Sequence, residues 1–438
     1  GRIQTLDDLE NSVITTSDNV PIFIKDVAQV KIGAAVKFGE GSANAKPAVL
    51  LTVQKQPQTN TIKLTENILE KLEEIKKTLD QKTKDDIQFS HERVRKFAEA
   101  QLKNYGQDFE VELSDGLFAG QKLIPVNTAG CYVPAGRYAH IASAVMSVTT
   151  AKVAGVKNII VASSPKPGVG VHPSIVYTAD LCGADSILNL GGVQGIAAMT
   201  NGLFGNAPAD MLVGPGNQFV TVAKQWATRY DVAIDMPAGP SELLVMADQT
   251  AKASYIASDL LSQAEHGTDS QVIFVTTYPP LIEAVTLELE KQCALLPRQD
   301  IASKALENSK MILLETKEAA VTLINQYAPE HYILCVSEEA FYLDHLTAAG
   351  SVFIGNYSPE SAGDYASGTN HTLPTNGYAR QYSGVNLDAF LNSISFQKLS
   401  AQGLQALGTS IELMAAAEGL DAHKNAVTIR LNDLRDGK

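Results

Sequence analysis

The 438-residue sequence predicts an α/β protein with two parallel-sheet domains in series, a helical C-terminal tail and a small α+β segment at the N-terminus. Three observations lead to this prediction. Beyond Gly120, short apolar runs alternate with stretches long enough for a helix, which is typical of a parallel sheet covered by helices. The alternation restarts at Glu242, and beyond Tyr378 only helical patterns continue. The economical interpretation is two sheets followed by a tail.

Each predicted sheet is built from short apolar runs. In the first sheet, we expect strands at residues 157–162, 186–190, 210–213 and 232–236. In the second sheet, we expect them at residues 242–246, 271–275, 310–314, 331–335 and 351–354. These strands predict two Rossmann-like domains, residues 122–240 and 241–377, after a helical lead-in over residues 80–121. The tail, residues 378–438, is too short for a core of its own and must pack on another part of the structure.

Residues 1–79 differ from the rest of the chain because they contain no histidine or cysteine. Strand-like runs are expected at residues 20–27 and 48–53. A helix is expected next, because apolar residues recur every three or four positions, at Leu64, Ile68, Leu72, Ile75 and Leu79. This segment therefore predicts a small α+β fold without a catalytic site.

Composition limits the class of partner. The net charge of −13 argues against nucleic acid and anionic membrane, which attract basic surfaces, and so favours a small-molecule substrate. The four cysteines, Cys131, Cys182, Cys293 and Cys335, lie far apart in the sequence, which indicates a reducing cytoplasm. No apolar run approaches the ~18 residues that span a bilayer.

A candidate metal site lies at the end of a predicted helix, in residues 261–271. Gln263 and His266 are three residues apart, so on a helix their side chains share one face and can reach one metal ion. Gly267 is of the type found just past a helix C-terminus, which places His266 at the helix end. The alternative is a surface glutamine and histidine near a helix cap.

Other titratable residues cluster in three further motifs. Glu330 and His331 stand where a helix ends and an apolar strand begins, and a carboxylate beside an imidazole suits general acid and base catalysis. The alternative is an edge pair that faces solvent. A long polar loop, residues 358–375, offers Asp364 and His371, and loops of this length are usually functional or disordered. In the tail, the run 418–423 supplies Glu418 and His423. The alternative is that this run is a solvated helix end.

Three turns at the predicted edge of the first sheet suit a nucleotide. Residues 214–217 (GPGN) join a strand to a helix and can cradle a phosphate, although such a turn can equally be a tight connection. Residues 191–194 (GGVQ) and the loop after Tyr132 follow other strands. Open α/β sheets bind nucleotides at such an edge.

Taken together, these motifs supply two histidines, one aspartate and one glutamine, a set of nitrogen and oxygen ligands compatible with zinc. Four of the eight histidines fall in the candidate motifs, namely His266, His331, His371 and His423. That concentration favours one shared site over four unrelated residues.

From about residue 85 onward the sequence closely resembles the histidinol dehydrogenase family, the zinc- and NAD-dependent enzymes that end histidine biosynthesis. The resemblance rests on five motifs in the family's order, residues 234–242 (IDMPAGPSE), 261–267 (LSQAEHG), 328–331 (APEH), 363–371 (GDYASGTNH) and 418–423 (EGLDAH). It implies a homodimer whose active sites are shared between the chains.

The resemblance also implies a role for each candidate residue. One zinc ion per chain would be bound by Gln263, His266, Asp364 and, from the other subunit, His423. Glu330 and His331 would be the acid/base pair. The substrate would be contacted by the zinc ligands, by His331 and by three further residues, Ser241, His371 and Glu418. NAD would be contacted by Tyr132, Gln194 and Asn217.

Two regions depart from the family pattern. The loop 132–146 (YVPAGRYAHIASAVM) has Ala135 where the family usually has glycine, and it resembles instead a sister branch that oxidises sulfonated diols. Residues 3–9, 20–28 and 46–53 resemble the porter region of heavy-metal efflux pumps of the resistance-nodulation-division type. The join near residue 80 therefore looks like a fusion.

The leading hypothesis is a dehydrogenase that oxidises L-histidinol through its aldehyde to L-histidine with two NAD. A second hypothesis is a zinc and NAD dehydrogenase of another small diol, such as a sulfonated propanediol. A third, of a different class, is an inactive fusion that acts as an interaction scaffold.

Overall fold

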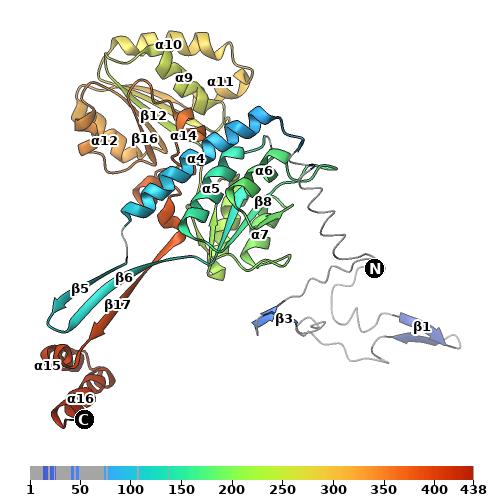
Figure 1. Ribbon diagram of the computed structural model, residues 1–438. Helices are drawn as coiled ribbons and strands as arrows, with labels where there is room; N and C mark the ends of the chain where they lie inside the picture. Colours follow the sequence, from blue (N-terminus) through green and yellow to red (C-terminus); the bar gives the residue numbers. More distant parts are fainter. Residues whose placement is uncertain are drawn as a thin grey trace. The chain divides into compact units, whose positions relative to one another are not determined.

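In the computed structural model, the chain divides into two compact units, Gly1–Gln54 and Lys55–Lys438. The structure describes residues 13–17, 20–23, 25, 41–43, 46–48, 74, 77–105, 108–136 and 138–437. Figure 1 labels the elements of both units. Of the helices in these ranges, none is both long and apolar enough to cross a membrane.

The first unit contains two short antiparallel hairpins among its described residues. One pairs β1 (Val13–Ser17) with β2 (Val20–Phe23), and the other pairs β3 (Gly41–Ala43) with β4 (Lys46–Ala48). The strand predicted from residue 20 is thus confirmed for its first four residues. The rest of that prediction (residues 24, 26 and 27), residues 49–53, and the helix positions Leu64, Ile68, Leu72 and Ile75 lie outside the described residues.

The first large sheet of the second unit is parallel and has the strand order β11-β10-β7-β8-β9. Its strands are β7 (Thr128–Val133), β8 (Asn158–Ser163), β9 (Ser186–Leu188), β10 (Met211–Val213) and β11 (Ala233–Ile234). Helices α5 (Ile141–Ala154) and α6 (Pro173–Cys182) pack on one face, and α7 (Gly192–Thr200) and α8 (Gln218–Ala227) pack on the other (Figure 1). Alternate residues of β7 and β8 belong to the two hydrophobic cores on opposite faces of the sheet. The prediction of a parallel sheet covered by helices is therefore confirmed.

The second large sheet is also parallel, in the order β14-β13-β12-β15-β16. Its strands are β12 (Glu242–Ala247), β13 (Gln271–Thr276), β14 (Lys310–Leu313), β15 (His331–Cys335) and β16 (Ser351–Ile354). One face is covered by α9 (Ala253–Ala264), α10 (Pro280–Cys293) and α11 (Gln299–Glu307). The other is covered by α12 (Lys317–Tyr327) and α13 (Glu339–Asp344). All five predicted strands are present, and β16 is followed by the short helix α14 (Glu360–Tyr365).

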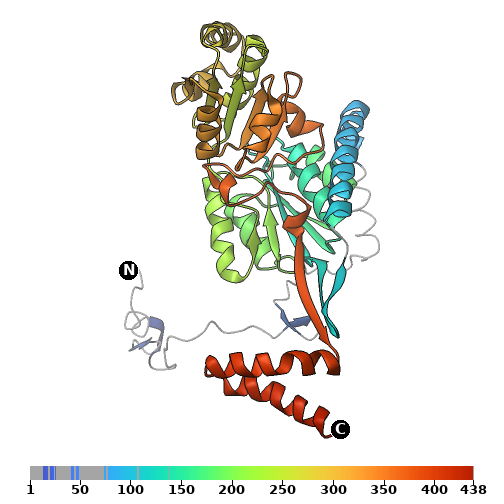
Figure 2. The same cartoon turned by 90° about the vertical axis from the view of Figure 1, so that its left-hand side faces the viewer.

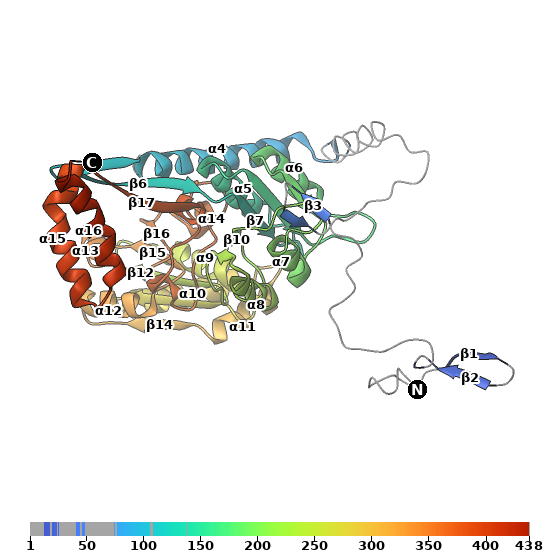
Figure 3. The same ribbon diagram turned by 90° about the horizontal axis from the view of Figure 1, so that it is seen from below.

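The lead-in predicted as helical over residues 80–121 is helical only in its first part. Helix α4 (Gln81–Asn104) begins after Asp80, whose side chain accepts the N–H of Thr83, and it packs along α5 (Figure 3). Beyond it, β5 (Phe109–Ser114) and β6 (Leu117–Pro125) form a hairpin. The helical prediction is therefore wrong for residues 109–121, which form β5, the turn and the first part of β6.

The tail was predicted to contain no strand, and this is wrong. Two short 3-10 turns, Tyr378–Arg380 and Leu387–Phe390, lead into β17 (Leu391–Leu399), which pairs antiparallel with β6 along its full length. The helical part follows as α15 (Ala401–Ala417) and α16 (Asp421–Arg435), which pack on each other beyond the end of β17 (Figure 2). The pairing strand lies some 270 residues earlier in the chain, so local sequence carries little trace of it.

Candidate active site

The catalytic candidates meet at the amino edge of the second sheet, where β12 and β15 begin. Helix α12 ends at Ala328, which has a left-handed backbone (φ +54°), and the chain then turns through Pro329 into β15. This turn places Glu330 just before β15 and His331 at its first position, next to Gln263 near the end of α9. Helix α9 ends at the same edge because it returns from the carboxyl end of β12 to the start of β13.

Glu330 and His331 are buried, with exposed fractions of 7% and 4%. The alternative of a solvent-facing edge pair is therefore wrong. The backbone of Glu242 links the two side chains: its N–H donates to Glu330 Oε2 at 2.8 Å, and its carbonyl lies 3.1 Å from His331 Nδ1. The amide of Gln263 donates to the same carbonyl at 3.3 Å and lies 3.5 Å from Glu330 Oε2.

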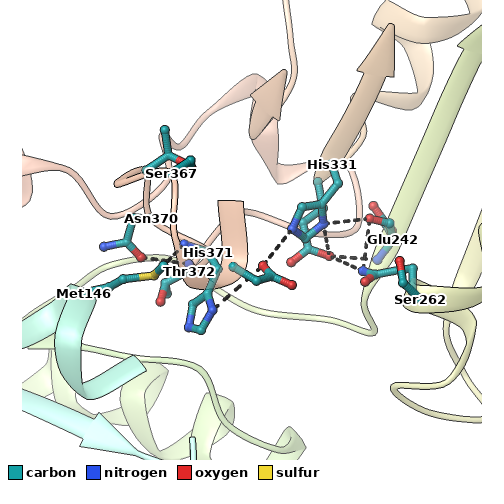
Figure 4. Close-up of polar contacts among 12 residues, drawn as sticks. Met146, Glu242, Ser262, His331, Ser367, Asn370, His371 and Thr372 are labelled. Atoms are coloured by element: carbon teal, nitrogen blue, oxygen red, sulfur yellow. Dashed lines mark hydrogen bonds and ion pairs between the residues drawn. The ribbon is translucent and has the colours of Figure 1, made fainter. Parts of the chain in front are cut away.

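This contact fixes which nitrogen of His331 can act as a base. A carbonyl oxygen only accepts hydrogen bonds, so Nδ1 must carry the proton that it shares with Glu242. In the neutral ring, Nε2 is then the nitrogen with the free lone pair. Among the described residues Nε2 has no hydrogen-bond partner, and its nearest charged neighbour is Asp364 Oδ1 at 3.9 Å. The base therefore faces into the site (Figure 4).

Four buried atoms in this region lack a partner in the described part of the chain: Glu242 Oε2, Gln263 Oε1, His331 Nε2 and Glu360 Oε2. Gln263 is fully buried, with an exposed fraction of 0%. Leaving one such atom unsatisfied costs about 1–3 kcal/mol, so a fold does not usually leave several together unless a ligand completes them. The unpartnered atoms thus mark a position for a bound group.

A metal ion fits this position. One ligand atom from each of His266, Glu360 and Asp364 lies within 4.8 Å of the other two. His266 was expected at the end of the helix, and it lies in the turn just after α9, where its N–H donates to the carbonyl of Gln263 at 3.2 Å. Asp364 was expected in a loop, but it belongs to α14. Glu360 was not among the predicted residues.

His371 joins the cluster from the segment after α14. Its Nδ1 lies 3.9 Å from Asp364 Oδ1, and its Nε2 is 2.9 Å from the hydroxyl of Ser143 on α5 (Figure 4). Its backbone N–H donates to the sulfur of Met146, also on α5. Through these contacts the helix that covers the first sheet closes the site of the second.

Burial and mutual charge control the protonation of these groups. Burial raises the pKa of Glu360 to about 8, and the neighbouring carboxylates add to this effect. Burial also lowers the pKa of His331, but the carboxylates of Glu330 and Glu360 outweigh it and raise that pKa to about 10. Burial lowers the pKa of His371 to about 3, so this imidazole is neutral. Such opposed shifts within one cluster are typical of functional sites.

The candidate nucleotide loops meet at the carboxyl edge of the first sheet. The hydroxyl of Tyr132 accepts the N–H of Gly192 at 2.9 Å, which ties β7 to the turn that carries Gln194. Gly214 has φ +118°, and a Cβ there would lie 2.1 Å from the carbonyl of Tyr132, so only glycine allows this approach. Asn217 caps α8 by accepting the N–H groups of Phe219 and Val220.

The remaining predicted residues are not brought into the cluster. Glu418 and His423 are exposed, at the end of α15 and in the first turn of α16. Ser241 precedes β12, and its carbonyl accepts the N–H of Gln271. Sequence reasoning missed Glu242 and Glu360, although Glu242 ends one of the quoted motifs and Glu360 lies in the polar stretch that contains Asp364.

This geometry defines a class of protein: an α/β enzyme in which a buried imidazole–carboxylate cluster meets the nucleotide-binding edge of a parallel sheet. Comparison with known proteins gives the family. The sequence model described as histidinol dehydrogenase matches residues 42–431, and the chain belongs to that family. It is accordingly an NAD-dependent oxidoreductase.

Individual relatives agree. The chain is 49% identical to the histidinol dehydrogenase of Bacteroides fragilis over 326 residues, which is 74% of this chain and 76% of the relative. It superposes on the crystal structure of histidinol dehydrogenase from Elizabethkingia anophelis with a TM-score of 0.81 at 45% identity, covering 84% of each chain. It is also 45% identical to the sulfopropanediol 3-dehydrogenase of Ruegeria pomeroyi over 354 residues, 80% of this chain and 81% of that one.

The family match begins at residue 42, inside the segment for which an efflux-pump resemblance was predicted. The comparisons therefore do not support a pump-like origin of residues 1–79.

Proposed function

We propose that the chain oxidises L-histidinol through histidinaldehyde to L-histidine, using two NAD in turn and one zinc ion per chain. Family membership supports the reaction class. The observation that carries the proposal further is the buried cluster in which Gln263 Oε1 and His331 Nε2 lack partners in the described residues, with His331 Nε2 3.9 Å from Asp364 Oδ1. An amino alcohol with an imidazole group offers nitrogen and oxygen atoms that complete such a cluster.

Zinc would be held by Gln263, His266 and Asp364, together with His423 of the partner subunit. The donor set of nitrogen and oxygen atoms suits zinc, and the unpartnered Gln263 Oε1 provides one donor that is otherwise unexplained. When bound, zinc supplies a positive charge that orients the substrate's nitrogen atoms and polarises its reacting group. That charge beside Asp364 would also favour the neutral form of His331, which a base requires.

The chain's own residues would carry the proton transfers. His331 Nε2 takes the hydroxyl proton while the hydride leaves for the nicotinamide. Glu330 then takes a proton from water, so that hydroxide adds to the aldehyde carbon and the hydrate can lose a second hydride. The substrate would also contact Ser241, His371 and Glu418. Because the cluster is buried, the aldehyde is protected between the two steps.

NAD would bind at the carboxyl edge of the first sheet, in contact with Tyr132, Gln194 and Asn217. The hydrogen bond between Tyr132 and Gly192 holds two of the loops together before the cofactor arrives. The N-terminus of α8, behind Asn217, carries the partial positive charge of the helix dipole, which favours a phosphate there. Support also comes from the link between His371 and Ser143, which joins this half of the molecule to the metal cluster.

One observation favours a second substrate, a sulfonated diol: the chain is 45% identical to a sulfopropanediol 3-dehydrogenase. Absorbance of NADH, measured with histidinol and separately with sulfopropanediol, distinguishes the two. The proposal expects turnover with histidinol at a kcat/KM well above that for the diol. Turnover with the diol alone would replace the proposed substrate, and turnover with neither would support a scaffold.

Assignment to the reducing cytoplasm and the division into five parts, with boundaries near residues 80, 122, 241 and 378, belong to the same proposal. The four cysteines are buried and free in the structure, which supports a reducing compartment.

The dimer with shared sites is proposed from the exposure of the tail. His423 is exposed on a segment whose helices pack on each other, and a ligand on such a segment is easily supplied across a twofold axis. If so, His331→Ala and His423→Ala chains, each inactive alone, regain activity when unfolded and refolded together. Each mixed dimer then has one site with both defects and one with neither. Random pairing predicts recovery of roughly a quarter of the wild-type activity.

If His423 served its own chain, every site in the mixture would keep a defect, and no activity would return. Size-exclusion chromatography of the refolded mixture serves as the control, because absence of recovery counts against the shared site only when the dimer has formed. As a second control, His423→Ala refolded alone should form a dimer and stay inactive.

A further inference from the structure

Glu360 is a buried carboxylate at the site that has no role in the proton transfers proposed above. It is the first residue of α14, and its exposed fraction is only 1%. Its Oε2 atom has no hydrogen-bond partner in the described ranges. Among these residues no lysine or arginine forms an ion pair with it either. A carboxylate that is taken out of water without a partner is costly, so its retention needs an explanation.

Glu360 lies close to two of the proposed metal ligands, and its charge acts on the proposed base. One of its oxygens lies within 4.8 Å of ligand atoms of His266 and Asp364. Its charge also acts on His331 strongly enough to be the second contribution that favours the protonated imidazole, after Glu330. A group bound between His331 and Asp364 would therefore lie against Glu360.

An amino alcohol fits this arrangement. Its hydroxyl must face His331 Nε2 to lose a proton, and its amino group is attached to the neighbouring carbon atom. The amino group thus lies one carbon away from the reacting centre, on the side of the metal ligands, where Glu360 Oε2 is the unpartnered acceptor. An N–H to carboxylate hydrogen bond would satisfy both groups.

We propose that Glu360 binds the amino group of the substrate and thereby selects an amino alcohol over a diol or a sulfonated alcohol. This inference rests on the proposed oxidation of histidinol, and it assigns recognition of the histidinol amino group to Glu360. Selection has an attractive and a repulsive part, because a diol leaves the carboxylate unpaired and a sulfonate brings a second negative charge to it.

The test compares two ligands that differ only in the amino group. Histidinol and imidazolyl propanol, the same alcohol without its amino group, are titrated calorimetrically into the zinc-loaded dimer without NAD. In wild type, histidinol binds more tightly. In Glu360→Gln, which keeps the size of the side chain and removes its charge, affinity for histidinol is expected to fall roughly 10- to 100-fold. Affinity for imidazolyl propanol is expected to change less than about threefold, within the usual scatter for a lost neutral contact.

Two controls accompany the titration. Asp259→Asn removes another carboxylate whose charge acts on Glu360. Asp259 does not belong to the candidate metal-binding group of His266, Glu360 and Asp364, so this variant should leave the ratio of the two affinities unchanged. Glu360→Asp keeps the charge on a shorter side chain and should give an intermediate ratio. Glu360→Gln is expected to fold as stably as wild type, because it replaces a buried carboxyl group without a hydrogen-bond partner on Oε2 by a neutral group of the same size.

The outcomes separate this proposal from the function on which it rests. If Glu360→Gln weakens both ligands equally, or weakens neither, the amino-group role is overturned and histidinol oxidation stands. If elemental analysis shows that Glu360→Gln has lost zinc, Glu360 is a metal ligand instead, and the role is again overturned. If wild type binds neither ligand, the proposed function and this inference fail together.

Discussion

The two large sheets use their buried polar side chains in opposite ways. In the first sheet the buried charged groups are paired, although the Ser163 hydroxyl has no partner in the described residues. Asp235 accepts the N–H groups of Gly214 and Met236 and forms a buried ion pair with Lys224, which also donates to the carbonyl of Gly214. In the second sheet, Gln263, His331 and Glu360 each keep an atom without a partner in the described part of the chain.

The difference indicates separate roles: buried polar groups of the first sheet stabilise the fold, and those of the second sheet are available for chemistry. Asp235 and Lys224 hydrogen-bond to the backbone of Gly214 and hold this turn in place, so the edge proposed to bind NAD has its shape before a ligand arrives. The polar groups of the second sheet are aligned by the Glu242 backbone but leave their reactive atoms open. Variants in the second sheet should therefore lose chemistry and keep the fold, whereas variants in the first should lose stability.

The largest effect is expected from His266→Ala, which removes a proposed zinc ligand beside the unpartnered Gln263 Oε1. Zinc affinity should fall by more than the roughly 100-fold that loss of an outer partner of a metal ligand causes, and turnover should fall with it. Elemental analysis after dialysis and an NADH assay measure both. The matched control is His345→Ala, at an exposed histidine, which should change neither. If His266→Ala kept its zinc and its turnover, Gln263 and His266 would be ordinary residues near a helix cap.

Next in size are the effects of Glu330→Gln and His331→Gln, which should bind zinc normally and lower turnover by about 10²- to 10⁴-fold. His331→Gln should impair alcohol oxidation, because it removes the nitrogen that takes the hydroxyl proton. Glu330→Gln should impair aldehyde oxidation more, because it removes the group that activates water. Assays that start separately from histidinol and from histidinaldehyde compare the two steps. Equal losses in both steps for both variants would contradict the separate roles.

Local sequence was sufficient to predict the nine strands named for the two sheets and a set of residues that the structure brings together. Gln263, His266, Glu330 and His331 were found because each pair is close in sequence and stands at the end of a helix or the start of a strand. Their roles remain predictions. Glu360 was missed because its burial comes from the packing of α14 against other elements, which no local pattern records.

Long-range pairing explains the other failures. Strand β17 and the β5–β6 hairpin form one three-stranded sheet from segments at opposite ends of the second unit. In β17 most side chains are exposed or half-buried, so its apolar residues do not alternate clearly. Patterns predict a strand when one face is buried, and they fail where pairing with a distant strand decides the structure.

A smaller effect, now on stability, is expected from Lys224→Met in the first sheet. The variant leaves Asp235 buried without its cation, and loss of one partner of a buried pair costs about 3–5 kcal/mol. Denaturant unfolding measures the loss, and zinc content should stay unchanged. The control is Lys317→Met in the pair with Glu338, which is largely exposed and should cost no more than about 1 kcal/mol. Equal costs for the two variants would contradict the supporting role of the buried pair.

The smallest effect concerns the pH dependence of stability through His91, on the helix that packs along α5. Its Nδ1 lies 2.9 Å from the hydroxyl of Thr149, and burial, with the charge of Arg95, lowers its pKa below the ordinary value of 6.5. The unfolded chain therefore binds this proton more readily than the folded one. The contribution of His91 to stability is present above pH 6.5 and is lost as the pH falls through that value toward the folded pKa.

Other buried histidines shift in the same direction, so the contribution of His91 has to be measured as a difference between variants. Unfolding free energies of wild type and His91→Gln, compared above and below pH 6.5, should show a weaker loss on acidification in the variant. Gln keeps a donor for Thr149, and the exposed His345→Gln should follow wild type. If His91→Gln lost stability on acidification as steeply as wild type, the acid sensitivity of the chain would arise elsewhere. Other buried histidines with lowered pKa values, His140 and His371, would then be the source.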